Sequence, residues 1–144
     1  MNPVRLCMKF LVSDDDFDSR RLVQKILYPF GYVDVTTDGE EAVAAFQTAL
    51  RDNDPYDLIT LDIIMPNADG QQALREIREI EKERGIPPEK VAKIIMISGL
   101  DDPQEAHDAF FLGTATSYII KPIRRQALLD EIRRLGLPLK EQET

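Results

Sequence analysis

Short apolar runs alternate with amphipathic helical patterns along almost the whole chain, and this alternation restricts the fold more than any other feature. The apolar runs cover residues 8–12, 32–36, 58–61, 91–97 and 118–120, and apolar residues at helical spacing follow each of them. Successive strand–helix units joined by right-handed crossovers form a parallel sheet with helices on both faces. We therefore expect an α/β fold with a doubly wound, five-stranded parallel sheet in three α/β/α layers, the βα unit being repeated five times.

Capping residues and helix-stopping residues mark the helices between these runs. We expect Asp16 or Asp18 to cap the first helix, and Asp38 with Glu41 to form a capping box at the second. Pro103 is expected to open the fourth helix. The charged side chains of the third helix, through Arg84, are expected to face solvent. The apolar residues predicted to face the core are Leu22, Val23, Ile26, Leu27, Phe30, Val43, Phe46, Ala49, Leu50, Leu74, Ile77, Ile80, Ile123, Leu128, Ile132 and Leu135.

Length and composition favour one acidic domain. The 144 residues carry a formal net charge of −8, which opposes attraction to nucleic acid or to an anionic membrane surface. Cys7 is the only cysteine, and no apolar run approaches the roughly 20 residues that cross a bilayer. We expect a cytoplasmic protein without direct nucleic-acid or membrane binding. Its predicted parts are a short N-terminal extension (1–7), the folded domain (8–136) and a polar C-terminal tail (137–144).

Polar side chains follow four of the predicted strands at the point where each strand ends. Asp62 directly follows the apolar run 58–61, and Asp14, Asp15 and Asp16 follow the first one. Ser98 and Lys121 follow the last two. The carboxyl ends of parallel strands meet at one edge of the sheet, where open α/β sheets bind ligands. Each residue alone is an ordinary turn or surface residue, but together they predict a site.

Carboxylates crowded at one edge repel one another unless a cation neutralises them. An oxygen-only ligand set suits Mg²⁺, which keeps open positions for phosphate groups. Lys121 would add a positive charge and Ser98 a hydroxyl donor for phosphate oxygens. Aspartate is also a known nucleophile in phosphoryl transfer, a reaction that depends mainly on positioning and charge neutralisation. The pattern thus indicates a magnesium-assisted phosphoryl acceptor.

The chain resembles the response-regulator receiver family, the phospho-acceptor half of two-component signalling. The resemblance covers about residues 8–135 and rests on motifs that occur in the family's order. These are Asp14-Asp15, Asp62 with Met65-Pro66, Asp69-Gly70, Ser98-Gly99, and Tyr118 three residues before Lys121-Pro122. The resemblance implies a flavodoxin-like, CheY-like fold.

The same resemblance implies a role for each residue at the predicted acceptor. Asp62 is expected to be the phosphorylation site and Asp15 a direct Mg²⁺ ligand, with Asp14 close by. The backbone carbonyl of Ile64 is expected to complete the protein's ligands, so the predicted metal site is Asp14, Asp15, Asp62 and Ile64. The domain would catalyse only its own phosphorylation and slow dephosphorylation, and we expect it not to be an enzyme in the ordinary sense.

The resemblance also implies a switch. Ser98 is expected to move toward the phosphoryl group and Lys121 to pair with it, while Tyr118 turns inward. This movement would alter the surface of the fourth helix, the final strand and the fifth helix. The family further implies a cis peptide bond before Pro122.

Four features of the sequence depart from the family's usual pattern or modify its chemistry. Ser13 stands where an apolar residue is common, which predicts that the first strand ends one residue early. Residues 84–93 form a longer connection than usual, and residues 113–118 contain one extra residue. The side chains two positions after Asp62 and Ser98 are Ile64 and Leu100, both apolar. Neither can hydrogen-bond an attacking water, which predicts slow self-dephosphorylation.

The expected partners are a sensor histidine kinase or phosphotransfer protein that donates the phosphoryl group, and a downstream protein. A weak or phosphorylation-dependent homodimer is consistent with opposite charges on two neighbouring segments, Asp101, Asp102, Glu105 and Asp108 on one and Arg124 and Arg125 on the other. Two alternatives remain. One is a Mg²⁺-dependent phosphatase or phosphotransferase with an aspartyl nucleophile, which commonly has a second acid where this chain has Ile64. The other is a phosphorylation-independent interaction module.

Overall fold

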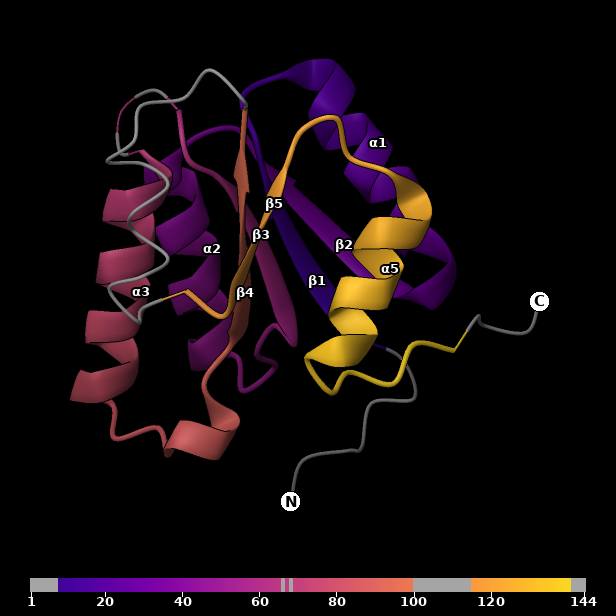
Figure 1. Cartoon of the computed structure of the whole chain (residues 1–144). Helices are drawn as coiled ribbons and strands as arrows, with labels where there is room; N and C mark the ends of the chain where they lie inside the picture. The colour runs from indigo at the N-terminus through magenta and orange to yellow at the C-terminus, as the bar shows by residue number, and fades with distance from the viewer. Residues whose placement is uncertain (1–7, 66, 68, 100–114, 141–144) are drawn as a thin grey trace.

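The computed structural model describes residues 8–65, 67, 69–99 and 115–140 and contains one parallel five-stranded sheet (Figure 1). The strands are β1 (Met8–Ser13), β2 (Gly31–Thr36), β3 (Leu58–Asp62), β4 (Lys93–Ser98) and β5 (Ser117–Ile120), in the spatial order β2-β1-β3-β4-β5. The chain therefore starts near the middle of the sheet and reverses its winding direction once. This arrangement confirms the predicted doubly wound α/β fold and its flavodoxin-like topology.

Helices cover both faces of the sheet. One face carries α1 (Phe17–Leu27) and α5 (Arg125–Arg134), and the other carries α2 (Gly39–Arg51) and α3 (Gly70–Glu83) (Figure 1). Short 3₁₀ turns at Tyr28–Phe30 and Pro88–Lys90 lead into β2 and β4. Asp16, Asp38 and Asp69 cap α1, α2 and α3 by accepting hydrogen bonds from backbone N–H groups in the first turn. The two predicted aspartate caps are therefore confirmed, with Asp16 rather than Asp18 at α1.

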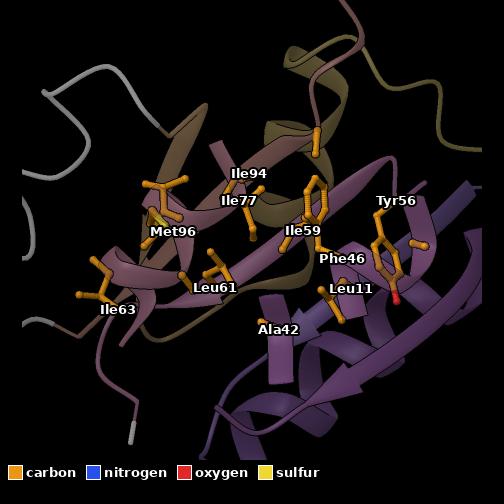
Figure 2. Close-up of a cluster of buried hydrophobic side chains, with 14 residues drawn as sticks. Leu11, Ala42, Phe46, Tyr56, Ile59, Leu61, Ile63, Ile77, Ile94 and Met96 are labelled. Atoms are coloured by element: carbon orange, nitrogen blue, oxygen red, sulfur yellow. The ribbon is translucent and has the colours of Figure 1, made fainter. Parts of the chain in front are cut away.

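Two apolar cores fill the space between the sheet and its helices. The core under α2 and α3 is built around Phe46, Ile59, Leu61 and Ile77, with Tyr56 at its margin (Figure 2). The core under α1 and α5 contains, among others, Phe10, Val12, Leu27, Leu128 and Ile132. Strands β1, β3 and β4 are buried on both faces, which explains why they read as continuous apolar runs in the sequence.

In α2 the predicted Val43 packs against the core and is partly buried, and Ala42 beside it is fully buried. Two other expectations were wrong. Leu22 is 42% exposed, because Val23 next to it takes the inward position on α1. Ser13 does not shorten β1: it pairs with Thr36 and Leu61, and its buried hydroxyl donates to the backbone carbonyl of Asp38 at 3.3 Å.

Glu81 corrects the expectation that the charges at the end of α3 all face solvent. Its side chain is buried, and Oε2 accepts a hydrogen bond of 2.7 Å from the N–H of Ala92. Oε1 pairs with the guanidinium of Arg78 at 2.6 Å. Glu81 thereby ties the long connection 84–92 to α3, because it satisfies a backbone donor at the start of β4.

The predicted N-terminal extension, Leu100 and the predicted fourth helix lie outside the described residues. The first part of the predicted polar tail packs against the domain, because Leu139 is buried in the core under α5. No helix in the described ranges combines the length and the apolar character that a membrane span requires.

Candidate functional site

Asp62 is the last residue of β3 and lies at the carboxyl edge of the sheet. Its side chain is largely buried, and Oδ1 accepts a hydrogen bond of 3.0 Å from the N–H of Ile64. The N–H of Ile63 continues the pairing with β4 by donating to the carbonyl of Ile97 at 2.9 Å. The carboxylate is therefore held by the strand end and by the first residues of the following loop.

Gly70 explains how α3 begins so close to this strand end. Its N–H donates to the carbonyl of Ile63 at 2.8 Å. A Cβ atom at this position would lie 2.2 Å from the carbonyl oxygen of Asp62, a distance that no side chain can adopt without backbone movement. The Asp69-Gly70 pair thus provides the helix cap and the close backbone approach at once.

Asp14 and Asp15 follow β1 and lie beside Asp62. The three residues each offer a carboxylate oxygen within 4.8 Å of the others. Asp14 is buried and accepts a hydrogen bond of 2.9 Å from the N–H of Asp16, whereas Asp15 is exposed. Arg20 on α1 donates to the backbone carbonyl of Asp14 at 2.9 Å, which holds the loop between β1 and α1 in place.

Lys121 provides the positive charge of the site. Its Nζ lies 2.7 Å from Oδ2 of Asp62 and 3.5 Å from Oδ2 of Asp14. The backbone also fixes this residue, because its N–H donates to the carbonyl of Ser98 at 2.7 Å and the bond to Pro122 is cis, as expected. The end of β5 therefore places the ammonium group beside the carboxylates of Asp62, at the end of β3, and Asp14, directly after β1.

The electrostatic environment leaves the carboxylates short of positive charge. Burial raises the pKa of Asp14 to about 7, and the neighbouring carboxylate of Asp62 adds to this effect. Burial alone would lower the pKa of the Lys121 ammonium, but its hydrogen bond with Asp62 holds that pKa above its usual value. Among the described residues, Oδ2 of Asp14 accepts no hydrogen bond. A hard cation fits these oxygens, because it would neutralise a carboxylate that Lys121 only partly compensates.

Ser98 lies on β4, the strand next to Asp62, and Tyr118 lies on β5, one strand further along the sheet. Ser98 is the last residue of β4, is fully buried, and donates from Oγ to the carbonyl of Gly99 at 3.1 Å. Tyr118 pairs with Met96 in the sheet and is partly buried against the core under α2 and α3. The structure thus brings the predicted residues Asp14, Asp15, Asp62, Ser98 and Lys121 to one edge, with Tyr118 further back on β5.

The structure adds neighbours that the sequence did not identify. Met65 is buried, and its sulfur lies 3.4 Å from Oγ of Ser13. Asn67 has a left-handed φ of 65° and donates from Nδ2 to Oδ2 of Asp38 at 2.8 Å. An asparagine in a Gly-containing turn after the strand was the only signal for this contact, because asparagine tolerates the left-handed region.

The sequence matches the family model described as the response regulator receiver domain over residues 10–133. It is 33% identical over 126 residues to the chemotaxis protein CheY of Treponema pallidum, an alignment that covers 86% of this chain and 79% of that protein. It is 37% identical over 128 residues to the probable transcriptional regulator ycf27 of Cyanophora paradoxa, covering 88% of this chain but 47% of that protein. The chain thus spans about half the length of the latter relative. It belongs to the response regulator receiver domain family, the receiver component of two-component systems.

Solved structures show the same fold. The CheX–CheY–BeF₃–Mg²⁺ complex from Borrelia burgdorferi contains a chain with a TM-score of 0.73 and 30% identity, covering 91% of this chain and 90% of that one. The receiver domain of the histidine kinase CKI1 from Arabidopsis thaliana, complexed with Mg²⁺ and BeF₃⁻, has a TM-score of 0.74 and 28% identity, covering 89% of each chain. The chain is therefore a CheY-like receiver domain with a signalling role.

Proposed function

We propose that this receiver domain accepts a phosphoryl group on Asp62 from a phosphohistidine of a sensor histidine kinase or phosphotransfer protein. The observation that carries the proposal is the placement of the Asp62 carboxylate. It is largely buried, 2.7 Å from the Lys121 ammonium and grouped with the carboxylates of Asp14 and Asp15. Such a group combines a nucleophile with the positive charge that phosphoryl oxygens need.

Mg²⁺ is the proposed cofactor, held by the carboxylates of Asp14, Asp15 and Asp62 and by the backbone carbonyl of Ile64. When bound, the ion supplies charge neutralisation for the phosphoryl oxygens and for the carboxylates themselves. The elevated pKa of Asp14, near 7 because of burial, supports this role, since the site lacks enough positive charge of its own. Solved complexes of two family members contain Mg²⁺ together with BeF₃.

The residues of this chain account for the transfer step. An oxygen of Asp62 forms a bond to phosphorus while the bond from phosphorus to the donor imidazole nitrogen breaks, and the electron pair of that bond stays on the imidazole. Lys121 then pairs with a phosphoryl oxygen in place of the carboxylate oxygen it now contacts. The N–H of Ile64 keeps Asp62 oriented through its hydrogen bond to Oδ1.

The proposed signal to a downstream protein begins at Ser98 on β4 and Tyr118 on β5. Ser98 moves toward the phosphoryl group, Tyr118 turns inward, and the surface around β5 and α5 changes for a downstream protein. A weak or phosphorylation-dependent homodimer is part of this proposal. Slow hydrolysis is also proposed: the side chain of Ile64, two residues after Asp62, is 49% exposed and offers water no hydrogen bond. Leu100, the other residue in that argument, lies outside the described residues.

A phosphatase or phosphotransferase that turns over substrate is the second candidate, since it would use the same aspartyl chemistry. The side chain of Ile64 argues against it, because such enzymes commonly have an acid there to protonate the leaving group. A phosphorylation-independent interaction module would not need the buried charges of Asp14 and Asp62.

Intact-mass measurement separates these proposals. The purified protein is incubated with acetyl phosphate, with and without Mg²⁺, beside Asp62→Asn and the control Asp18→Asn, which changes an exposed carboxylate on α1. We expect one Mg²⁺-dependent phosphoryl adduct in wild type and in Asp18→Asn, and none in Asp62→Asn. Steady phosphate release without an adduct would instead support the enzyme. The absence of both the adduct and phosphate release would support the interaction module.

A further inference from the structure

Asp38 joins three segments around the acceptor site. Its carboxylate oxygen Oδ1 accepts the N–H of Glu41 at 2.8 Å and so caps α2, while Oδ2 accepts Nδ2 of Asn67 at 2.8 Å. Its backbone carbonyl accepts the hydroxyl of Ser13 at 3.3 Å. The loop before α2, the end of β1 and the loop after β3 therefore meet at one residue.

The Asn67 side of this junction belongs to the loop that carries Ile64. Asp62 and Ile64 lie at one end of that loop, and Asp69 and Gly70 anchor the other end to α3. Between these ends, the contact from Asn67 to Asp38 ties the loop to a segment outside its own βα unit. Asn67 makes this contact from a backbone with a left-handed φ of 65°, a conformation that larger or β-branched side chains would not adopt readily.

The contact is charge-assisted, because the amide donates to a carboxylate. The hydrogen bonds that Asp38 accepts, first from the backbone of Glu41 and then from Asn67, hold its pKa below the usual value. Asp38 therefore remains an anion throughout the neutral pH range. The link persists under the conditions in which Mg²⁺ and a phosphodonor would bind.

We infer that Asn67 is a positioning residue for the phospho-acceptor loop, acting through its hydrogen bond to Asp38 to hold the Ile64 carbonyl and Asp62 in a metal-binding arrangement. The expected effect of Asn67 on phosphorylation rests on the proposed function. Its effect on Mg²⁺ affinity can be measured without any phosphoryl transfer. Outer contacts that orient metal ligands commonly contribute tenfold or more to affinity. Because this contact is exposed, the loss on its removal is expected to be roughly threefold to tenfold.

The test uses variants that keep the local backbone and the helix cap. Asn67→Gly keeps access to the left-handed conformation but removes the amide, and Asp38→Ser keeps a capping oxygen for α2 but cannot reach Asn67. Asn67→Asp places two carboxylates in contact, and the exchanged pair Asp38→Asn with Asn67→Asp restores one amide–carboxylate hydrogen bond at unchanged net charge. Glu40→Gln, at an exposed position on α2, is the matched charge control.

Calorimetric Mg²⁺ titration and the rate of phosphorylation by acetyl phosphate provide the readouts. We expect Asn67→Gly and Asp38→Ser to weaken Mg²⁺ binding by similar factors, and the double variant to be no weaker than either. Asn67→Asp should be weaker still, and the exchanged pair should recover most of the affinity. Additive losses, or no recovery in the exchanged pair, would overturn the inference, because they would indicate independent structural effects.

Amide hydrogen exchange of the peptide covering 62–70 is a third readout, and it depends on neither Mg²⁺ binding nor phosphorylation. If wild type binds Mg²⁺ but takes no phosphoryl group, the proposed function fails while the titration still decides the inference. If wild type binds no Mg²⁺, the proposed metal site fails. In that case faster exchange of this peptide in Asn67→Gly, with recovery in the exchanged pair, would support loop positioning, and unchanged exchange would contradict it.

Discussion

The ammonium group of Lys121 lies 2.7 Å from the carboxylate of Asp62, although the two residues are 59 positions apart in the chain. Parallel strands deliver both side chains to the same edge, Asp62 at the end of β3 and Lys121 directly after β5. The ammonium also lies 3.5 Å from Asp14, so a single cation serves two buried carboxylates. This imbalance of charge underlies the first two predictions.

Removing the Lys121 charge should destabilise the metal-free domain. Lys121→Gln leaves Asp62 and Asp14 without their cation, and we expect the free energy of unfolding at pH 8 to fall by about 1–2 kcal/mol, a value reduced because the lysine is partly exposed. Urea denaturation measures the change, and Lys140→Gln is the control at an exposed lysine. Added Mg²⁺ should recover part of the loss. Equal stability of Lys121→Gln and wild type without Mg²⁺ would argue against this charge balance.

Neutralising Asp14 should have the opposite effect. The pKa of Asp14 is about 7 in the folded protein, above its ordinary value of 3.8, because the carboxyl is buried. The native state therefore binds more protons than the unfolded state between these values, and the metal-free protein loses stability as pH rises through that window. Asp14→Asn keeps the acceptor for the N–H of Asp16 and removes this penalty.

We expect Asp14→Asn to raise the unfolding free energy at pH 8 by roughly 1–3 kcal/mol, and by much less at pH 4.5. Asp15→Asn is the matched control, because the neighbouring carboxylate is exposed. Urea denaturation in the presence of a chelator, at both pH values, provides the measurement. A gain that did not depend on pH would contradict the assigned cause.

Gly70 should not tolerate a side chain. In Gly70→Ala the new methyl group would meet the carbonyl oxygen of Asp62 at 2.2 Å, so either α3 or the end of β3 must move. We expect a loss of about 2–3 kcal/mol in unfolding free energy and weaker Mg²⁺ binding. Gln72→Ala, at an exposed position in the same helical turn, should change neither quantity. Normal Mg²⁺ affinity in a folded Gly70→Ala protein would show that the close approach does not position the site.

Glu81 should matter for stability and not for phosphorylation. Glu81→Ala leaves the buried N–H of Ala92 without its acceptor and removes the partner of Arg78. We therefore expect the free energy of unfolding to fall by about 2–3 kcal/mol. Glu81→Gln keeps an acceptor oxygen and should lose less, and the exposed Glu79→Ala should be close to wild type. Thermal unfolding together with the acetyl phosphate assay distinguishes the two properties. A lower phosphorylation level in Glu81→Gln than in wild type would contradict this prediction, because it would show that Glu81 affects phosphorylation as well as stability.

Features that a single physical rule determines could be predicted from the sequence. Buried parallel strands require continuous apolar residues, and their carboxyl ends share one edge, so the sequence alone is enough to group Asp14, Asp62, Ser98 and Lys121. The caps of α1 and α2 followed from the residue type and its spacing from the first apolar position.

The errors arise where a side chain meets a segment far away in the chain. The burial of Glu81 depends on the path by which residues 84–92 return over α3, and helical periodicity contains no information about that path. The contact between Asn67 and Asp38 depends on one left-handed backbone angle in a loop. Leu22 and Val23 are neighbours on α1, and which of them faces the core depends on how the helix rotates on the sheet.

Reductive trapping shows directly whether Asp62 itself receives the phosphoryl group. Wild-type protein is phosphorylated with acetyl phosphate and Mg²⁺ and then treated with borohydride, which converts only an acyl-phosphorylated aspartate to homoserine. Tandem mass spectrometry of the peptides locates the converted residue. We expect homoserine at position 62 and intact aspartate at positions 14 and 15. Homoserine at position 14 or 15, or a phosphoryl adduct with no homoserine at position 62, would contradict the assignment of Asp62 as the acceptor.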